Sequence, residues 1–471
     1  MPSPNAAETE PSKANLDAIV DAARAEHGPR GAALDPRKIA RVIGRLVNRG
    51  EIGPGSQLPT VRALARGLRV SPSTVSEAWR ILRAHEVITT DRRRGTVVRT
   101  SRGDVEGRYW NVPASPGAYE FDLSSGTPDP SLLPSLTGAL ERVQVDLTMS
   151  SYLDSPVVPA LEKALLSSWP YVPERLTIVD GAQDGLDRII NAHVHLGDTV
   201  VVEDPTFPPI IDMLELRGAR VIGVRCDAQG IVPGELESVI AQQPTALFLQ
   251  PRAQNPIGVA MSESRRDDLA DLLSETHVLV VEDDHSGSIS GAELHSIGTP
   301  LPNQVLHIRS FSKSHGPDLR LAALSGPAEL LDPVIHRRHL GPSWTSRLLQ
   351  QVLLELLESE AERNHIEHAT AVYAMRRHNF IEQLAQRGVP RSELATAGTG
   401  MNVWLPVDDE QHAVTALAAQ GIGVAPGRPF MVNATDQDYI RITTATLATP
   451  TDAERVADAV AASFDMERPV E

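Results

Sequence analysis

The stretch Val305-Leu306-His307-Ile308-Arg309-Ser310-Phe311-Ser312-Lys313 gives the clearest indication of the fold. Its first four residues have the apolar character of a buried strand, and a lysine follows shortly after the predicted end of that strand. Helical segments separate several other apolar runs of this kind, at 176–179, 199–202, 220–224, 246–249, 278–281 and 321–324. This alternation predicts an α/β domain with a largely parallel sheet that is covered by helices on both faces.

The rest of the chain suggests further domains, because 471 residues are too many for one hydrophobic core. Two long helices at 346–359 and 361–387, strands at 401–405 and 439–443, and a last helix from about Thr451 predict a smaller α+β domain. Residues 1–33 show little pattern beyond a weak helix near 16–25. The predicted division is a flexible tail (1–33), a head (34–100), a linker (101–120), a large domain (121–345) and a small domain (346–471).

The head shows the order helix, helix, helix, hairpin. Its first helix begins at Asp35-Pro36, an N-cap followed by proline at the first helical position. A short second helix is predicted at 60–67, and Ser71 caps a third helix that runs to about residue 85. Two strands, at 87–90 and 96–99, flank a basic turn. This order predicts a winged helix-turn-helix.

The charge distribution separates the head from the rest of the chain. The whole sequence has a formal net charge of −17. Residues 35–99, however, contain fourteen Arg or Lys and five Asp or Glu, whereas the remainder contains 30 basic and 56 acidic residues. A basic module on an acidic body is typical of a DNA-binding protein, although composition alone also allows an ordinary basic surface patch.

Lysine is scarce, with residues at positions 13, 38, 163 and 313 only. Lys313 is the one that follows a predicted strand, which is where α/β folds place ligand sites. Arg320 comes seven residues later and could clamp a phosphate together with Ser310 and Ser312. The stretch Gly181-Ala182-Gln183 follows another strand and opens a helix, so its backbone N–H groups could hold the same phosphate.

The same region contains the other groups that pyridoxal 5′-phosphate (PLP) requires. Asp283 ends an apolar strand and could keep the pyridine nitrogen protonated, and Asn255 could donate to the ring oxygen O3′. Phe207 could stack on the ring. With Lys313 as the amine for a Schiff base, these residues predict a PLP site. Each residue alone has an ordinary structural explanation, and the prediction rests on the ordered set.

The head resembles the GntR family of regulators over nearly its whole length. The resemblance is carried by Ile52-x-Pro54-Gly55-Ser56-x-Leu58-Pro59-Thr60-x-Arg62, Leu64-Ala65, Val70-Ser71-x-Ser73-Thr74-Val75 and Arg94-Gly95-Thr96-Val97-Val98. It implies that a recognition helix in the major groove and the wing contact DNA, through Arg62, Ser71, Ser73, Thr74, Arg92, Arg93, Arg94 and Gly95. Pro72 departs from the family, which often has arginine at this position, and a solvated turn is the alternative for the wing arginines.

The body resembles fold-type I aminotransferases, and its fusion to a GntR-type head is the architecture of MocR regulators. The resemblance implies that Lys313 carries PLP, that Asp283 pairs with the pyridine nitrogen, and that Arg441 binds the carboxylate of a substrate or effector. His285 stands where the family usually has a tyrosine that contacts O3′, so we expect an altered proton balance and weak transamination. Related dimers also suggest that Tyr152 reaches the phosphate of a neighbouring subunit.

These features favour a transcriptional regulator. We expect a homodimer that binds double-stranded operator DNA and senses PLP, an amino acid or an amine. The alternative is an active PLP-dependent aminotransferase that has kept a DNA-binding head. The single cysteine, Cys226, excludes an internal disulfide, and no apolar stretch is long enough to span a membrane. We therefore expect a cytoplasmic protein without a metal site.

Overall fold

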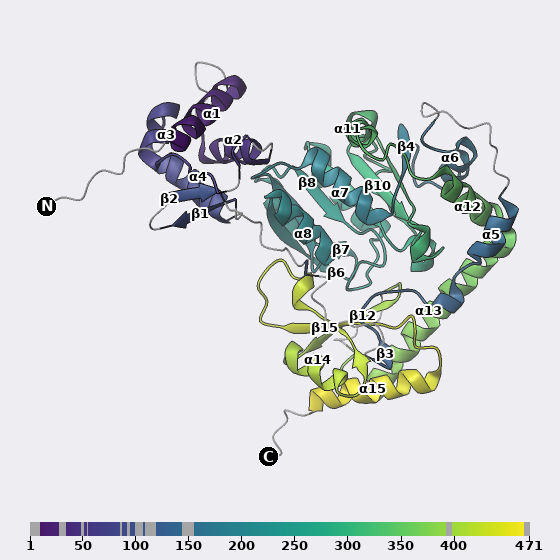
Figure 1. The fold of residues 1–471 in the computed structure, drawn as a ribbon. Coiled ribbons are helices and arrows are strands. Elements are labelled where there is room, and N and C mark those ends of the chain that lie inside the picture. The colour runs from purple at the N-terminus through teal and green to yellow at the C-terminus, as the bar shows by residue number, and fades with distance from the viewer. Residues whose placement is uncertain are drawn as a thin grey trace, which may run out of the picture. The chain divides into compact units, whose positions relative to one another are not determined.

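The computed structural model describes residues 10–27, 34–48, 51–53, 55–84, 87–91, 95–98, 107–108, 119–143, 155–391 and 398–465. They divide into two compact units (Figure 1). The head holds the described residues up to Val98, and the body holds nearly all of the described residues from 107 onward. Each unit has a hydrophobic core of its own.

The head is a winged helix-turn-helix, as the sequence predicts. Its elements are α1 (Glu10–His27), α2 (Pro36–Asn48), α3 (Val61–Leu68), α4 (Pro72–Ala84), β1 (Ile88–Asp91) and β2 (Gly95–Val98). Asp35, Thr60 and Ser71 each accept a hydrogen bond from the backbone N–H three residues later, at 2.9, 3.2 and 3.1 Å. These caps satisfy N–H groups that the first helical turns leave free, and so they fix where α2, α3 and α4 begin.

The helix α1 differs from the flexible tail that the sequence suggested for residues 1–33. Residues 10–27 are helical, and Ile19 is fully buried in the core of the head. A Cβ on Gly67 of α3 would lie only 2.8 Å from Val20 Cγ2, so the two helices touch at this glycine. Asn15 also donates to the backbone oxygen of Gln57, 42 residues away. Such contacts with distant residues leave no local pattern in a mostly polar helix. The sequence therefore predicted neither the full length of α1 nor its packing in the head.

The body is built on an eight-stranded sheet with the order β4-β11-β10-β9-β8-β5-β6-β7. Its strands are β4 (Arg175–Val179), β5 (Thr199–Asp204), β6 (Arg220–Asp227), β7 (Gly230–Ile231), β8 (Ala246–Leu249), β9 (Leu279–Asp284), β10 (Val305–Ser310) and β11 (Ala322–Gly326). The pairs β5–β8, β8–β9 and β9–β10 are parallel, whereas β11 is antiparallel to β10 and β4. The predicted α/β class and the largely parallel sheet are confirmed.

The central strands of this sheet are covered on both faces. Every residue of β5, β8 and β9 is buried, as expected for parallel strands between helices. Figure 1 shows α7 lying across one face of the sheet. The helices of this region are α5 (Leu136–Arg142), α6 (Pro159–Leu166), α7 (Ala182–His193), α8 (Pro208–Arg217), α9 (Pro233–Ile240), α10 (Glu263–Ser274), α11 (Ala328–His339) and α12 (Arg347–Glu358).

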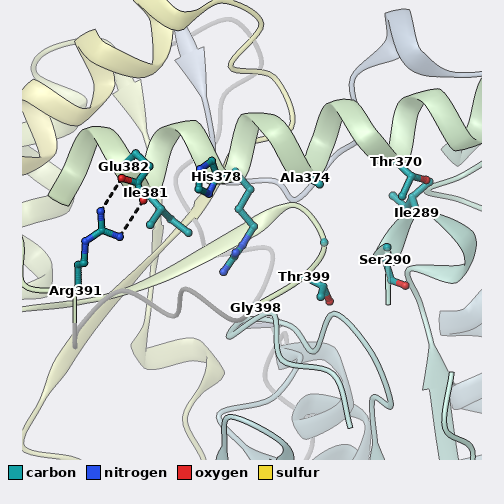
Figure 2. A pocket seen from close by; sticks show the side chains of 13 residues that line it. Ile289, Ser290, Thr370, Ala374, His378, Ile381, Glu382, Arg391, Gly398 and Thr399 are labelled. Carbon is teal, nitrogen blue, oxygen red and sulfur yellow. Dashed lines mark hydrogen bonds and ion pairs between the residues drawn. The ribbon is translucent and has the colours of Figure 1, made fainter. Parts of the chain in front are cut away.

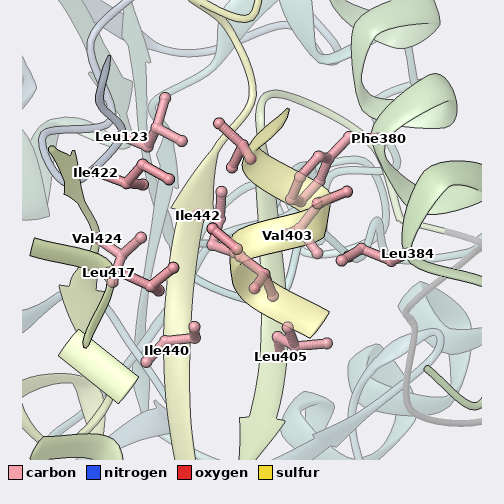
Figure 3. Close-up of a cluster of buried hydrophobic side chains, with 14 of the residues drawn as sticks. Leu123, Phe380, Leu384, Val403, Leu405, Leu417, Ile422, Val424, Ile440 and Ile442 are labelled. Carbon is pink, nitrogen blue, oxygen red and sulfur yellow. The ribbon is translucent and has the colours of Figure 1, made fainter. Parts of the chain in front are cut away.

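A smaller α+β layer forms the C-terminal part of the body. It contains α13 (Glu360–Gln386), β12 (Asn402–Val407), α14 (Glu410–Ala418), β13 (Ile422–Gly423), β14 (Ala425–Pro426), β15 (Asp438–Thr443) and α15 (Pro450–Asp465). Figure 3 shows its core, in which Phe380 and Leu384 of α13 lie with Val403 and Ile442 of the strands. Among the helices of the described part of the chain, none is both long and apolar enough to cross a membrane.

Residues 121–123 lie in this C-terminal layer and not in the large domain in which the sequence placed them. Phe121–Asp122 form β3, which pairs in parallel with β13. Leu123 is fully buried in the same core (Figure 3). A strand of two residues is too short to give a recognisable pattern. Because β3 and Leu123 belong to the C-terminal layer, the chain passes through this layer before it reaches α5 and β4.

Candidate functional site

The sheet register brings the predicted cofactor residues to one edge of the sheet. Glu282 pairs with Leu249, and Asp283 pairs with Ile308, so β8, β9 and β10 end side by side. Asp283 is the penultimate residue of β9, and Lys313 follows shortly after β10. This is the carboxyl edge, at which α/β sheets bind ligands.

The side chain of Lys313 reaches the chain segment that follows β3. Its Nζ donates a hydrogen bond to the carbonyl oxygen of Gly126 at 3.1 Å. Burial, together with the nearby charge of Arg441, lowers the pKa of the Lys313 amine to about 8, although Asp283 raises it. A lysine with this pKa exists in part as the free amine near neutral pH, and the free amine is the form that attacks an aldehyde.

Asp283 offers a buried oxygen atom that has no partner among the described residues. Its Oδ2 accepts a hydrogen bond from Gln250 Nε2 at 2.8 Å, whereas Oδ1 is buried and accepts none from the described residues. Burial raises the pKa of Asp283 to about 6, although the bond from Gln250 lowers it. A buried acceptor without a partner costs about 1–3 kcal/mol. The site therefore fits a ligand that brings a donor, as the protonated ring nitrogen of PLP does.

Arg441 and Asn255 meet at the same site, although they lie 186 residues apart. Arg441 Nη1 donates to Asn255 Oδ1 at 3.2 Å, and Nη2 donates to the carbonyl oxygen of Ser124. The guanidinium lies 5.0 Å from the ring centre of Phe430, and Arg441 is only 1% exposed. Arg441 is thus a buried cation and not the surface ion pair that a lone arginine on a strand usually forms. With Asn255 Oδ1 occupied, the Nδ2 group is the end left to donate to a ligand.

The predicted phosphate-binding residues gather around the antiparallel strand β11. Ala322 of β11 pairs with Ser310 on one side and with Val179 of β4 on the other. Gly181 follows β4 and has a φ of +97°, and a Cβ built on it would lie 3.4 Å from the guanidinium of Arg320. A glycine is favoured here by both the backbone conformation and the close approach of the arginine.

The start of α7 completes this phosphate-binding set. Ala182 is the first residue of α7, so Ala182 and Gln183 carry N–H groups of a first helical turn, which can bind an anion. Arg320 Nη2 donates to the backbone oxygen of Asp180 at 3.0 Å, which holds the guanidinium beside this turn. Ser312 N donates to Ser310 Oγ at 3.3 Å in the turn after β10. The residues present fit a phosphate group.

His285 uses its ring N–H within the protein. Its Nε2 lies 2.9 Å from the carbonyl oxygen of Ala253, and because a carbonyl oxygen only accepts, Nε2 carries the proton. Burial and the nearby charge of Lys313 lower the pKa of His285 to about 3, so the ring is neutral at physiological pH. The tyrosine that the resemblance leads one to expect would donate to O3′, whereas the N–H of His285 is bound to Ala253. Asn255 is therefore the better placed donor for O3′.

The roles of Phe207 and Tyr152 stay predictions. Phe207 is half-buried in the turn between β5 and α8. This turn lies near the site, because Thr206 N donates to the backbone oxygen of Phe430, the residue that packs against Arg441. Tyr152 lies outside the described residues.

Three groups of this site were not expected from the sequence. Gln250 donates a hydrogen bond to Asp283. The carbonyl oxygens of Ser124 and Gly126 accept hydrogen bonds from Arg441 and Lys313, respectively. Gln250 directly follows a predicted strand, and this position was the signal that could have identified it. The two carbonyl contacts have no such signal, because they join residues 317 and 187 positions apart.

A separate cavity of about 340 Å³ lies along α13 (Figure 2). In it, Arg391 donates two hydrogen bonds to the carboxylate of Glu382, at 2.9 and 2.6 Å. None of the described residues that line it belongs to the predicted cofactor set. The lining residues are Ile289, Ser290, Gly291, Thr370, Ala374, Arg377, His378, Ile381, Glu382, Arg391, Gly398, Thr399 and Gly400.

The surface around α3 and α4 carries the helical part of the predicted DNA-binding set. Arg62, Ser71 and Ser73 are exposed. Ser71 Oγ lies 2.7 Å from both Ser73 Oγ and Thr74 Oγ1, and it caps α4 by accepting from Thr74 N. The three hydroxyl groups therefore cluster at the N-terminus of the recognition helix, where a DNA phosphate can bind.

The wing is a short antiparallel hairpin, as predicted. β1 and β2 pair from Ile88–Val98 to Asp91–Gly95. Gly95 has a φ of +75°, a conformation that glycine adopts without strain. Arg92, Arg93 and Arg94 lie outside the described residues.

Two family profiles match the chain. The profile of aminotransferase class I and II matches residues 119–460. The profile of the bacterial regulatory proteins of the gntR family matches residues 37–98. The first match covers most of the body, and the second covers the head from α2 to the wing.

Transcriptional regulators are among the similar curated proteins. The vitamin B6 salvage pathway transcriptional repressor PtsJ of Salmonella typhimurium is 33% identical over 406 residues, which cover 84% of this chain and 91% of that protein. The pyridoxine biosynthesis transcriptional regulator PdxR of Corynebacterium glutamicum is 25% identical over 413 residues, which cover 83% of this chain and 87% of that protein.

Solved aminotransferases share the fold of the body. LysN, an alpha-aminoadipate aminotransferase of Thermus thermophilus in complex with N-(5'-phosphopyridoxyl)-L-leucine, has a TM-score of 0.66 at 23% identity, over 75% of this chain and 95% of LysN. The kynurenine aminotransferase of Pyrococcus horikoshii has a TM-score of 0.68 at 22% identity, over 78% of this chain and 99% of that enzyme. PLP is the cofactor of this aminotransferase family, and the residues at the ends of β8, β9 and β10 fit it. The chain therefore belongs to the aminotransferase class I and II family and carries a gntR-type DNA-binding head, which is the domain combination of the MocR regulators.

Proposed function

We propose that this protein is a transcriptional regulator that binds operator DNA through its head and responds to PLP, an amino acid or an amine bound in its body. One observation carries the proposal. The same short segment, a little after the linker, accepts hydrogen bonds from both Lys313 and Arg441. We name this segment, residues 121–127, the strap. A ligand that engages either side chain changes the hydrogen-bond partners of the strap.

The strap is anchored to the C-terminal layer at its start. The N–H groups of Phe121 and Leu123 donate to the backbone oxygens of Gly421 and Gly423, at 3.0 and 2.8 Å. Thr443 N donates in turn to the backbone oxygen of Leu123 at 2.9 Å. The strap then continues to the two carbonyl groups that contact the cofactor site. One continuous stretch of chain thus connects the linker, the C-terminal layer and this site.

Ligand binding is expected to alter both strap contacts. PLP supplies an aldehyde and a ring that withdraws electrons. Lys313 provides the amine for that aldehyde, so its nitrogen no longer donates to Gly126 as a free ammonium group. Arg441 binds a carboxylate more strongly than the neutral oxygen of Ser124, because a hydrogen bond between two charged groups is stronger. In this proposal the loss of these contacts moves the strap and, through the linker, changes the arrangement of the heads.

The other site residues hold the cofactor in this proposal. Asp283 keeps the pyridine nitrogen protonated, and Asn255 donates to the ring oxygen. Phe207 stacks on the ring, and His285 lies beside it as a neutral group. The phosphate is bound by Gly181, Ala182, Gln183, Ser310, Ser312 and Arg320.

The head binds DNA as a helix-turn-helix. We expect α4 to enter the major groove, with Arg62, Ser71, Ser73 and Thr74 at phosphates or base edges. The wing residues Arg92–Gly95 contact the backbone or the minor groove. The protein acts as a homodimer in this proposal, because operators with two half-sites match a protein with two-fold symmetry.

An active aminotransferase is the second candidate, because Lys313, Asp283 and Arg441 are all present at the site. Fast transamination is disfavoured by His285, whose N–H is bound to Ala253. A multiple-turnover assay with common amino donors separates the two functions. We expect slow or absent turnover, and rates of about 1 s⁻¹ or more, which are ordinary for enzymes, would favour the aminotransferase.

Selection of genomic DNA fragments by the purified protein tests the regulator directly. We expect a few fragments to be enriched, each with two half-sites, and we expect Arg62→Ala to bind each of these fragments more weakly. The regulator proposal is contradicted if the wild-type protein enriches no fragment over bulk DNA.

A further inference from the structure

We propose that Gln250 is a positioning residue for the cofactor. Its carboxamide holds Asp283 and the backbone of Asn255 together, so that one oxygen of Asp283 is kept free and oriented for the pyridine nitrogen of PLP. This role rests on the proposed PLP site, to which neither the family resemblance nor the sequence pattern assigned Gln250.

The carboxamide of Gln250 uses both of its ends. Nε2 donates to Asp283 Oδ2 at 2.8 Å, and Oε1 accepts from Asn255 N at 2.8 Å. Gln250 is 3% exposed, so water has little access to replace either bond. A glutamate at this position would lack the donor, and a leucine would lack both donor and acceptor. Gln250 thus forms hydrogen bonds both to Asp283, the acid expected at the pyridine nitrogen, and to Asn255, the residue expected at O3′.

The bonding of Asp283 favours a role directed at a ligand over a purely structural one. Gln250 satisfies Oδ2 alone, while Oδ1 is buried and has no partner among the described residues. A structural network normally satisfies both oxygens, because a buried unpaired acceptor is destabilising. The bond at Oδ2 also limits rotation of the carboxylate, and so it sets the direction in which Oδ1 points.

A second acid lies next to this pair. Glu203 Oε2 accepts from Gln250 N at 3.0 Å and from Gln254 Nε2 at 3.2 Å. Burial raises the pKa of Glu203 to about 8, so the acid is largely neutral at neutral pH and repels Asp283 little. The other charged groups that act on Asp283 are Asp284 and Lys313. Among the described residues, Asp283 accepts a hydrogen bond from the neutral Gln250, and its Oδ1 remains available to the cofactor.

Substitution of Gln250 tests this role through the binding and the protonation of the cofactor. We expect Gln250→Leu to weaken PLP binding to the full chain about 10- to 100-fold, the value of a hydrogen bond to a charged group. The ¹⁵N resonance of ring-labelled PLP should also shift toward the unprotonated form. Gln350→Leu is the matched control, since Gln350 is also buried but forms hydrogen bonds to backbone groups of residues 156, 158 and 345. It should leave both readouts unchanged.

Gln250→Glu keeps the size of the side chain and serves if Gln250→Leu does not fold. The new carboxyl group faces Asp283, so PLP affinity should fall more steeply with rising pH than in the wild-type protein. Wild-type affinity together with the wild-type ¹⁵N resonance in either folded variant would overturn the role of Gln250 and leave the PLP site intact. If the wild-type protein does not bind PLP, the PLP site and this role are overturned together.

Discussion

The amino group of Lys313 donates a hydrogen bond to the carbonyl oxygen of Gly126 at 3.1 Å. Gly126 lies in the strap, and two residues earlier the strap also accepts a hydrogen bond from Arg441. The side chains expected to engage an aldehyde and a carboxylate are therefore bonded to one short segment that follows the linker in sequence. A regulator needs such a connection between its ligand site and its DNA-binding head, whereas an enzyme does not.

Lys313→Ala should abolish the covalent attachment of PLP, because no other amine of the chain is expected at the site. The absorption band that forms when PLP is added should disappear, and borohydride reduction followed by peptide mapping should find no adduct. Lys163→Ala, at an exposed position of α6, should behave like the wild-type protein. An unchanged band in Lys313→Ala would remove Lys313 from the site.

Arg441→Met should weaken the binding of amino acids to the PLP-loaded protein and leave PLP attachment intact. The loss of a charge-assisted contact predicts an affinity about 10- to 100-fold lower, measured by titrating the spectral change that amino acids cause. Arg391→Met is the control, because Arg391 is exposed and pairs with Glu382 away from the cofactor residues. Equal amino acid affinities for Arg441→Met and the wild-type protein would argue against Arg441 as the carboxylate-binding residue.

Glu203→Gln should make stability less dependent on pH. Burial raises the pKa of Glu203 to about 8 in the folded protein, above its ordinary value of 4.5. Between these values the unfolded chain releases the proton while the folded protein keeps it, so wild-type stability falls as pH rises. The stability gain of Glu203→Gln should therefore grow toward high pH, by at most about 1.4 kcal/mol per pH unit. Thermal unfolding between about pH 5 and 8 measures this trend, and a constant difference would contradict it.

Ile19→Ala should destabilise the head by about 2–5 kcal/mol, the usual cost of emptying a fully buried isoleucine position. The expected result is faster proteolysis of the head and weaker operator binding on warming, with unchanged PLP attachment to the body. Asp17→Ala, at an exposed position of the same helix, provides the comparison. If the two variants behave alike, α1 does not contribute to the core of the head.

Arg62→Ala should weaken operator binding and reduce the slope of its salt dependence by about one, as expected for the loss of one phosphate contact. Arg175→Ala removes the same charge from an exposed position of the body and controls for the change in net charge. A salt slope equal to that of the wild-type protein would place Arg62 away from the DNA backbone.

The sequence predicted the parts of the site that a local pattern can reveal. Lys313 and Asp283 follow or end apolar strands, and parallel strands end at a common edge, so their meeting was foreseeable. The caps Asp35 and Ser71 likewise have short-range signals in the residues that follow them. These features depend on chain neighbours within a few residues, which is the range that periodicity and capping describe.

Other parts of the site depend on contacts that no local pattern contains. The contacts of the strap could not be predicted from the sequence, because they use backbone oxygens, which every residue has. Their partners also lie 187 and 317 residues away. The N–H of His285 could not be assigned from sequence, since its acceptor is also a backbone oxygen, that of Ala253. Similarly, the packing of α1 depends on Gly67, which leaves room for Val20 only after the helices have docked.

The coupling between the cofactor site and DNA is tested most directly by one equilibrium measurement. The dissociation constant for a labelled operator is determined with and without saturating PLP, for the wild-type protein and for Lys313→Ala. We predict that PLP changes the wild-type constant by about fivefold or more, a usual strength of coupling between two sites, and leaves that of Lys313→Ala unchanged. Equal constants with and without PLP, in wild-type protein shown to carry the cofactor, would contradict the proposal that the body senses PLP.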